Sequence, residues 1–256
     1  QVKRTLHESF REQAKNLHDF NVYFLRGCFF AVLFIGCLDF LLALLRSIDV
    51  LKYLVGDTTA RALGLGNFVG PYLHMPLVVL GFVVARFSQT LGWTWLALLI
   101  VFAELIIVIS RYLFSYEQSF MADLVRYWYA ALFLFASAYT LYEEGHVRVD
   151  VIYAGLSDKV KAYVNAWGSY LLGVTTMTVV VVIGFNGKTS IINSPLLVFE
   201  ITNQGTNGMF IKYQMALFLG IFAATMLVQF VVQFFESLAD INEEPGKRDT
   251  SIKLAN

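Results

Sequence analysis

The stretch that decides the fold is Tyr139-Thr-Leu-Tyr-Glu-Glu-Gly-His-Val-Arg-Val-Asp-Val-Ile-Tyr-Ala-Gly-Leu-Ser157. It follows an apolar run, Ala130 to Leu141, and the run stops at two carboxylates, Glu143 and Glu144. Glycine is common just past the end of a helix, so Gly145 predicts that the helix ends there. The stretch therefore marks the place where an apolar helix gives way to a polar connector.

Polar and apolar residues alternate along this connector. His146, Arg148 and Asp150 are separated by valines, and alternate side chains of an extended segment face opposite sides. Ser157 then stands where it can cap a new helix, which soon becomes apolar again. We expect a polar connector between two membrane helices, amphipathic enough to lie on the bilayer surface.

The composition of the whole chain points to a membrane protein. Of the 256 residues, 57% are hydrophobic, 16% aromatic and only 15% charged, whereas about 25% of the residues in a soluble domain are charged. So much apolar surface cannot be hidden from water in a chain of this size. The formal net charge is zero, which argues against a nucleic-acid partner.

The cysteines and the N-terminal segment argue against three further features. Cys28 and Cys37 lie in one apolar run, and a helix would hold them roughly 13 Å apart, too far for a disulfide. We therefore expect no disulfide framework and no cysteine-based metal site. The segment Val2–Phe10 carries too many charged residues for a cleavable signal peptide.

About 20 apolar residues cross the hydrocarbon core of a bilayer, and six runs are candidates for such spans. They are Val22–Leu45, Pro71–Phe87, Trp93–Ile109, Arg126–Leu141, Val164–Phe185 and Met209–Phe235. The second run is interrupted near its start by His74 and Pro76. Val179–Ile183 favours a strand by propensity, but the length of the surrounding apolar stretch favours a helix.

The segments between the runs are polar. Residues 1–20 predict a charged amphipathic helix, Ser47–Gly70 a glycine-bearing connector, Arg111–Val125 a short link and Asn186–Gly208 a long loop. The glycines from Gly64 to Gly70 lack the spacing and the βαβ context of a dinucleotide fingerprint. The predicted organisation is an N-terminal helix at 1–20, a membrane extension at 21–90, a membrane domain at 91–240 and a charged tail at 241–256.

Several of these motifs resemble those of one transporter family. The box from Glu144 to Val151, followed by Leu156-Ser-Asp-Lys159, is similar to the small membrane subunit of tripartite ATP-independent periplasmic (TRAP) transporters, the DctQ-type family. Ser110–Phe114 and Asp123–Tyr127 stand where that family has an Arg-Tyr pair and a Glu-Leu-x-Arg motif. Glu200 and Gln229 fall at similar places downstream. The resemblance covers roughly residues 93–237, with Asp123 for the usual glutamate and Ala136 for a common glycine.

The resemblance implies an all-α polytopic membrane helix bundle, with a four-helix DctQ-like core and about two extra N-terminal transmembrane helices. It implies a scaffold subunit of the bacterial inner membrane that stabilises a large permease subunit and helps to dock a periplasmic substrate-binding protein. The system would take up an organic acid with sodium. The candidate partner-interface residues are His146, Arg148, Asp150, Arg111, Asp123, Arg126 and Glu200.

The bias of lysine and arginine predicts the orientation. With six spans and the N-terminus in the cytoplasm, most of the 19 basic residues lie inside. A single added span before the four-helix region would instead place Lys3, Arg4, Arg11 and Lys15 outside. We therefore expect the N-terminal extension to add two spans, with both chain termini in the cytoplasm.

Asp39 and Glu104 are the residues of the apolar runs whose insertion into a membrane is least favourable, since a charge at the bilayer centre costs roughly 2.5–3.5 kcal/mol on insertion scales. The two carboxylates mark one of two things: a site that binds an ion or a proton, or an ion pair. The pairing partner would be an arginine of this chain (Arg26, Arg46 or Arg111) or a partner subunit. Arg111, Asp123 and Arg126 form either a surface ion-pair cluster or a docking site for a soluble partner.

The alternative function is a membrane anchor of a redox complex that binds haem or a quinone. A bis-histidine haem needs ligands that face each other in the bundle, and only His74 and His146 lie near the predicted membrane segments. No catalytic constellation is visible, and Ser157 is a cap candidate. We therefore expect neither enzymatic activity nor a cofactor.

Overall fold

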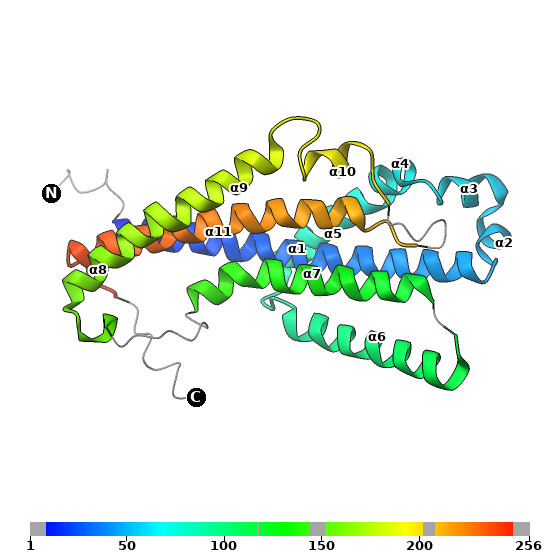
Figure 1. Ribbon diagram of the computed structural model, residues 1–256, viewed down its shortest axis with the longest axis horizontal. Helices are drawn as coiled ribbons and strands as arrows, with labels where there is room; N and C mark the ends of the chain where they lie inside the picture. The colour runs from blue at the N-terminus through cyan, green and yellow to red at the C-terminus, as the bar shows by residue number, and fades with distance from the viewer. Residues whose placement is uncertain (1–8, 117, 144–151, 202–207, 248–256) are drawn as a thin grey trace. The chain divides into compact units, whose positions relative to one another are not determined.

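The structure is a computed structural model of the chain, and residues 9–116, 118–143, 152–201 and 208–247 are described. Within these ranges all regular structure is helical (Figure 1), which confirms the predicted all-α class. The elements are α1 Phe10–Ser47, α2 Leu51–Val55, α3 Asp57–Ala62, α4 Gly66–Val69, η1 Gly70–His74, α5 Met75–Phe87, α6 Trp93–Phe114, α7 Ser119–Tyr142, η2 Tyr153–Gly155, α8 Asp158–Trp167, η3 Gly168–Val174, α9 Thr175–Phe185, α10 Asn193–Leu197 and α11 Lys212–Ile241.

Five continuous helical segments are long and apolar enough to cross a membrane, judged by length and composition over the described residues. They are Phe10–Ser47, Gly66–Phe87, Trp93–Phe114, Asp158–Phe185 and Lys212–Ile241. The run at 71–87 is thus part of the 22-residue segment Gly66–Phe87. This segment begins with α4, which precedes the run. The chain is a polytopic membrane helix bundle.

Helix α7 contains the fourth predicted run and has 24 residues. At about 1.5 Å per residue it is long enough to span, yet it is not among the five segments above. Asp123, Arg126 and several tyrosines, serines and threonines lower the mean hydropathy of this helix. The sixth span therefore stays a prediction.

Several predicted boundaries were wrong because the helices continue through polar residues. The N-terminal amphipathic segment, from Phe10 onward, and the first apolar run form one helix, α1. Within this helix, the side-chain amide of Asn21 donates to the backbone carbonyl of Thr225 at 3.1 Å. The link expected at Arg111–Val125 shrinks to residues 115–118 between α6 and α7. The polar segment after α1 holds the short helices α2, α3 and α4, and α11 runs on to Ile241, beyond the apolar run that ends at Phe235.

Two other local predictions can be compared with the structure. Val179–Ile183 is helical within α9, as its length favoured. Ser157 has the extended backbone of an N-cap before α8, but its hydroxyl makes no capping hydrogen bond. Gly145 and the box His146–Asp150 lie outside the described residues.

The chain divides into two compact units, and each is described by itself. The first comprises 1–22, 137–182 and 222–256. Here the carboxylate of Glu244 accepts the backbone N–H groups of Phe10 and Arg11 at 3.3 and 3.1 Å, at the positive end of α1. The Arg11 guanidinium lies 2.8 Å from Asp240. A hydrogen bond from Lys159 also holds the pKa of Glu243 below its usual range.

The second unit comprises 23–136 and 183–221. Aromatic rings of α1 pack on α6 and α7: Phe29 contacts Trp93 and Phe135 at 5.1 and 5.8 Å, and Phe40 contacts Phe120 at 5.6 Å between ring centroids. The short helices after α1 bury Leu51, Leu63 and Val69 in one cluster with Leu42, Phe210 and Tyr213. The N-terminal extension is thus packed directly on helices of the region that resembles the transporter family.

Candidate functional site

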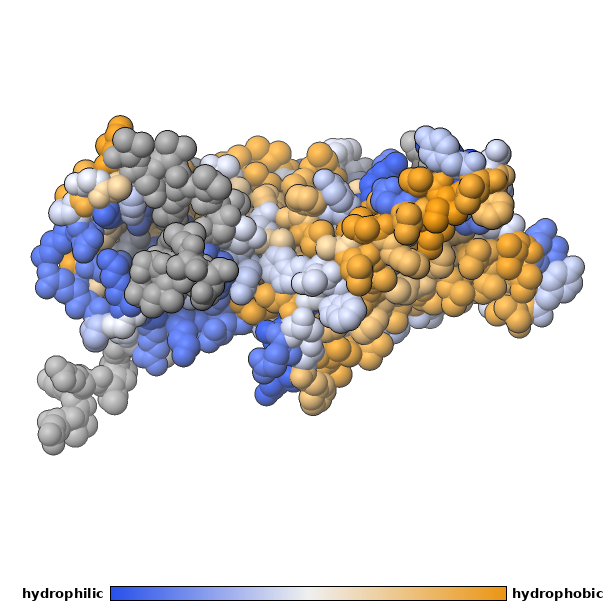
Figure 2. Space-filling view, turned by 90° about the horizontal axis from the view of Figure 1, so that it is seen from below, coloured by the Kyte–Doolittle hydropathy of each residue, from blue (hydrophilic) through white to orange (hydrophobic). Residues whose placement is uncertain are grey.

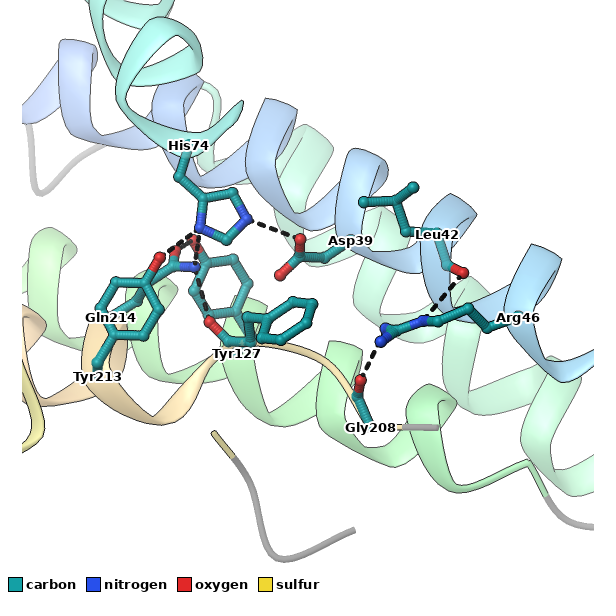
Figure 3. Close-up of polar contacts among 9 residues, drawn as sticks. Asp39, Leu42, Arg46, His74, Tyr127, Gly208, Tyr213 and Gln214 are labelled. Carbon is teal, nitrogen blue, oxygen red and sulfur yellow. Dashed lines mark hydrogen bonds and ion pairs between the residues drawn. The ribbon is translucent and has the colours of Figure 1, made fainter. Parts of the chain in front are cut away.

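The described residues bring together a buried polar cluster in the second unit, which we call the His74 cluster and define as Asp39, His74, Tyr127, Tyr213 and Gln214 (Figure 3). Asp39 comes from α1, His74 from the end of η1, Tyr127 from α7, and the last two from the first turn of α11. All five side chains are buried. Four separate helical segments therefore meet at one polar point.

The local sequence explains why His74 can point into this cluster. Pro76 has no N–H, so the carbonyl of Tyr72 cannot receive the usual helical hydrogen bond. The chain there forms a π turn, η1, whose last residue is His74. Such widened turns often occur at functional sites because they change the direction of a side chain.

The hydrogen bonds of the cluster form one consistent chain of donors and acceptors. The Gln214 amide nitrogen donates to the carbonyl of Phe210 at 2.9 Å and to Nδ1 of His74 at 3.1 Å, while its oxygen accepts from the Tyr127 hydroxyl. Nδ1 of His74 is therefore an acceptor, and its single lone pair is shared between the Gln214 amide and the Tyr213 hydroxyl. The ring proton then lies on Nε2, which donates to Oδ1 of Asp39 at 2.7 Å.

Asp39 was expected to pair with an arginine if it paired within the chain, and the structure gives it a histidine instead. Its side chain is fully buried and its second oxygen, Oδ2, has no hydrogen-bond partner among the described residues. Arg46, two turns further along α1, donates to the carbonyls of Leu42 and Gly208 at 3.4 and 3.1 Å and stacks on Phe210 (Figure 3). It thereby joins α1 to the residues that precede α11.

Asp123 is not at the surface, contrary to the expected surface ion-pair cluster. It is completely buried, and its Oδ2 accepts the backbone N–H of Met209 at 3.2 Å. Its Oδ1 lies 3.6 Å from the exposed guanidinium of Arg126, one turn along α7. This carboxylate therefore holds the backbone just before α11. Arg111 is exposed near the end of α6.

Glu200 and Gln229 are not members of the His74 cluster as defined above. Glu200 forms an ion pair with Lys212, and its carbonyl accepts the N–H of Tyr213 at 3.1 Å, so Glu200 is held against the first turn of α11. In the first unit, Gln229 lies 3.4 Å from Nδ1 of His18. His146, Arg148 and Asp150 lie outside the described residues.

Glu104 lies in the middle of α6 and is exposed. Among the described residues it forms no hydrogen bond or ion pair. The two carboxylates that the sequence marks as costly thus have opposite surroundings, since Asp39 is enclosed by this chain and Glu104 is not.

The cluster does not offer a ligand for haem iron. Both ring nitrogens of His74 are engaged by protein groups, Nδ1 by Tyr213 and Gln214 and Nε2 by Asp39. The described residues also contain no group of three or more histidine, cysteine or acidic side chains that could hold a metal ion. What the arrangement does is join helices.

Sequence reasoning missed His74 as the partner of Asp39, and it missed Tyr127 and Tyr213 as members of the cluster around His74. The available signal was that Asp39 and His74 both interrupt apolar runs, and polar residues in membrane segments tend to pair with one another. No local pattern links the two, because 35 positions separate them along the chain.

Comparison with known proteins agrees with the placement of the motifs. The family model of the DctQ component of tripartite ATP-independent periplasmic transporters matches residues 97–240, more than half of the chain. No curated protein and no solved structure gives a significant match. The matched region contains α7 and α11, which supply three residues of the His74 cluster, whereas Asp39 and His74 lie before it. This chain belongs to the DctQ family of TRAP transporter components.

Proposed function

We propose that the chain is the small, static membrane subunit of a TRAP transporter. It would hold the large permease subunit in the membrane while that subunit carries the substrate and sodium sites and moves. The observation that carries the proposal is the DctQ match over residues 97–240. The transported substrate would be an organic acid delivered by a periplasmic binding protein.

The buried contacts of the second unit support a static role. Asp39 of α1 and Gln214 of α11 both bond to His74, Tyr127 of α7 bonds to Gln214, and Asp123 ties α7 to the backbone just before α11. Hydrogen bonds are stronger in the low dielectric of a protein interior than in water, so these buried bonds hold the helices together. A complete secondary transporter usually has inverted repeats and discontinuous helices, and we see no internal repeat in this sequence.

The N-terminal extension would be part of this scaffold. Asp39 and His74 lie outside the matched region but bond to Tyr213 and Gln214 within it. We propose that it crosses the membrane twice, with 47–70 outside and 88–92 inside, so that six spans leave both termini in the bacterial cytoplasm. The outward loops would help to dock the binding protein.

Reconstitution tests the proposal directly. Purified alone into liposomes with a sodium gradient, the chain is expected to take up no organic acid, whereas liposomes that also contain the large permease and the binding protein are expected to do so. Uptake by this subunit alone would contradict the scaffold role. An absorbance spectrum of the same sample tests the redox alternative, since a haem protein has a strong Soret band.

A further inference from the structure

Among the five candidate spans in the described part of the chain, α6 is one of the two with the smallest buried share. Only 17% of its most apolar window is buried, the same share as for the segment 158–185 and less than for the other candidate spans. Its inner side is the line Leu96, Ile100 and Ala103. Figure 2, which views the molecule from below, shows a largely hydrophobic surface over the region where α6 lies. Most of α6 is therefore free to meet lipid or another protein.

Glu104 does not suit a lipid-facing surface. It stands at the midpoint of the 22 residues of α6, which at about 1.5 Å per residue places it roughly 16 Å from either end. A glutamate side chain is too short to reach the headgroups from that depth, unlike a lysine or arginine near a helix end. A carboxylate there needs a donor inside the membrane.

Nothing in the described part of this chain supplies that donor. Glu104 is exposed and makes no hydrogen bond or ion pair with any described residue. Asp39, the other carboxylate in an apolar run, is fully buried and receives Nε2–H of His74. The fold thus gives the Asp39 carboxylate a hydrogen-bond donor, whereas it leaves the Glu104 carboxylate on the outer surface.

The residues around Glu104 form a continuous apolar surface, which we call the Glu104 face and define as Ala97, Val101, Glu104 and Val108. These positions are three or four apart, so they lie along one side of the helix. Ala97 is half-buried, whereas Val101 and Val108 are 65% and 48% exposed. The exposed segment 158–185 differs, because its acidic and basic residues lie only in its first turn, so its apolar face needs nothing beyond lipid.

We propose that the Glu104 face is the contact surface for a membrane helix that presents an arginine or lysine at mid-bilayer depth, and that this helix belongs to the large permease subunit. The identity of the partner rests on the proposed function, while the chemistry rests on a carboxylate that no described residue pairs. Paired charges are the usual form in which ionisable residues occur inside membranes. A second copy of the chain is a poorer occupant, because a two-fold contact through this face would bring Glu104 against itself.

The test is capture of the large permease by a tagged small subunit after co-expression and detergent extraction. The variants are Glu104→Asp, Glu104→Gln, Glu104→Leu and Glu104→Arg. A matched control moves the carboxylate around the helix at the same depth: the double variant E104L/L105E keeps the composition but points the acid elsewhere. Each isolated subunit is also examined by size-exclusion chromatography and thermal unfolding.

Glu104→Leu is expected to lower captured permease about ten-fold, equal to ~1.4 kcal/mol of binding free energy, and Glu104→Arg is expected to abolish capture. Glu104→Gln, which keeps a hydrogen-bonding group, is expected to fall between, and Glu104→Asp to retain most capture. E104L/L105E is expected not to recover it. Because the face points outward, Glu104→Leu is expected to leave the Tm of the isolated subunit equal or higher, which separates lost contact from lost folding.

Wild-type capture in the Glu104→Leu variant would overturn the inference and leave the scaffold function intact. Equal recovery by E104L/L105E would overturn it as well, since any acid at that depth would then suffice. If the wild-type chain itself captures no permease, the proposed function fails first. Self-association through Glu104, seen as a smaller species on size-exclusion chromatography of Glu104→Arg, would assign the face to a second copy and contradict the proposal.

Discussion

At the scale of single residues, the most informative feature is how each intramembrane polar group is satisfied. His74 acts as the common partner of Asp39, Tyr213 and Gln214, and the Gln214 amide fixes which ring nitrogen carries the proton. A buried polar group left without a partner costs about 1–3 kcal/mol, and more if it is charged. The cluster therefore stabilises the fold only while it is complete.

Replacing His74 by phenylalanine is expected to lower the free energy of unfolding by about 3 kcal/mol, because it leaves the Asp39 carboxylate buried without a donor. The double variant D39L/H74F, which removes both polar groups, is expected to be less destabilised than the sum of D39L and H74F. Denaturation of the purified protein in detergent measures all four species. Additive effects would show that the two side chains are not coupled.

Removing the hydroxyl of Tyr127 tests a second bond of the cluster. Tyr127→Phe leaves the Gln214 oxygen without its donor and is expected to cost about 1–3 kcal/mol. Tyr129→Phe is the matched control, because Tyr129 lies on the same helix and is 54% exposed, and a change there is expected to stay within about 0.5 kcal/mol. Equal Tm values for the two variants would contradict the role given to Tyr127.

At the scale of the elements, the N-terminal extension depends on a close crossing of α1 and α5. A Cβ added to Gly81 would lie 2.6 Å from the backbone nitrogen of Ala31 and 3.0 Å from the carbonyl oxygen of Gly27. Small residues let membrane helices approach closely enough for dispersion contacts, in the absence of a hydrophobic driving force between them. This crossing positions the segment that carries His74 beside Asp39.

Gly81→Ala is accordingly expected to destabilise the subunit by about 1–3 kcal/mol, because the clash is with backbone atoms that cannot rotate away. Gly168→Ala is the control, since a Cβ at that helical position meets nothing within 4 Å. Thermal unfolding in detergent compares them. A Gly81→Ala protein as stable as the control would mean that α5 can shift away from α1 at little cost.

At the scale of the whole molecule, the number of membrane crossings fixes the side of the membrane on which each loop lies. The 22-residue segment 66–87 is long and apolar enough to span, and Phe10–Ser47 precedes it as one continuous helix. If both cross, the connector between them lies on the side of the membrane opposite to the N-terminus. Thr59 is exposed on α3 in that connector.

A cysteine at Thr59, in a background without Cys28 and Cys37, is expected to react with a membrane-impermeant thiol reagent added from the periplasm. The reason is the positive-inside bias, which keeps the basic N-terminus in the cytoplasm and requires an even number of added spans. A cysteine at Gln89, in the opposite link between α5 and α6, is the control and is expected to react only after the membrane is opened. The reverse pattern would place the connector on the cytoplasmic side.

The sequence by itself determined the membrane class, the helical fold and the family, because apolar runs of bilayer length and a local motif depend only on residues close together in the chain. It also marked Asp39 and Glu104 as costly, since their positions within apolar runs are visible without any tertiary contact. The helix ends were less certain, because helices such as α1 and α6 continue through polar residues. Their limits depend on packing as well as on hydrophobicity.

Only the tertiary structure decided which polar residues meet. Asp39 and His74 are 35 positions apart, and His74 and Tyr213 are 139 apart, so no local pattern pairs them. The structure likewise buries Asp123 and exposes Glu104. Which side of a helix faces the interior depends on how whole helices cross, and that choice is made by long-range packing such as the contact of Gly81 with Ala31.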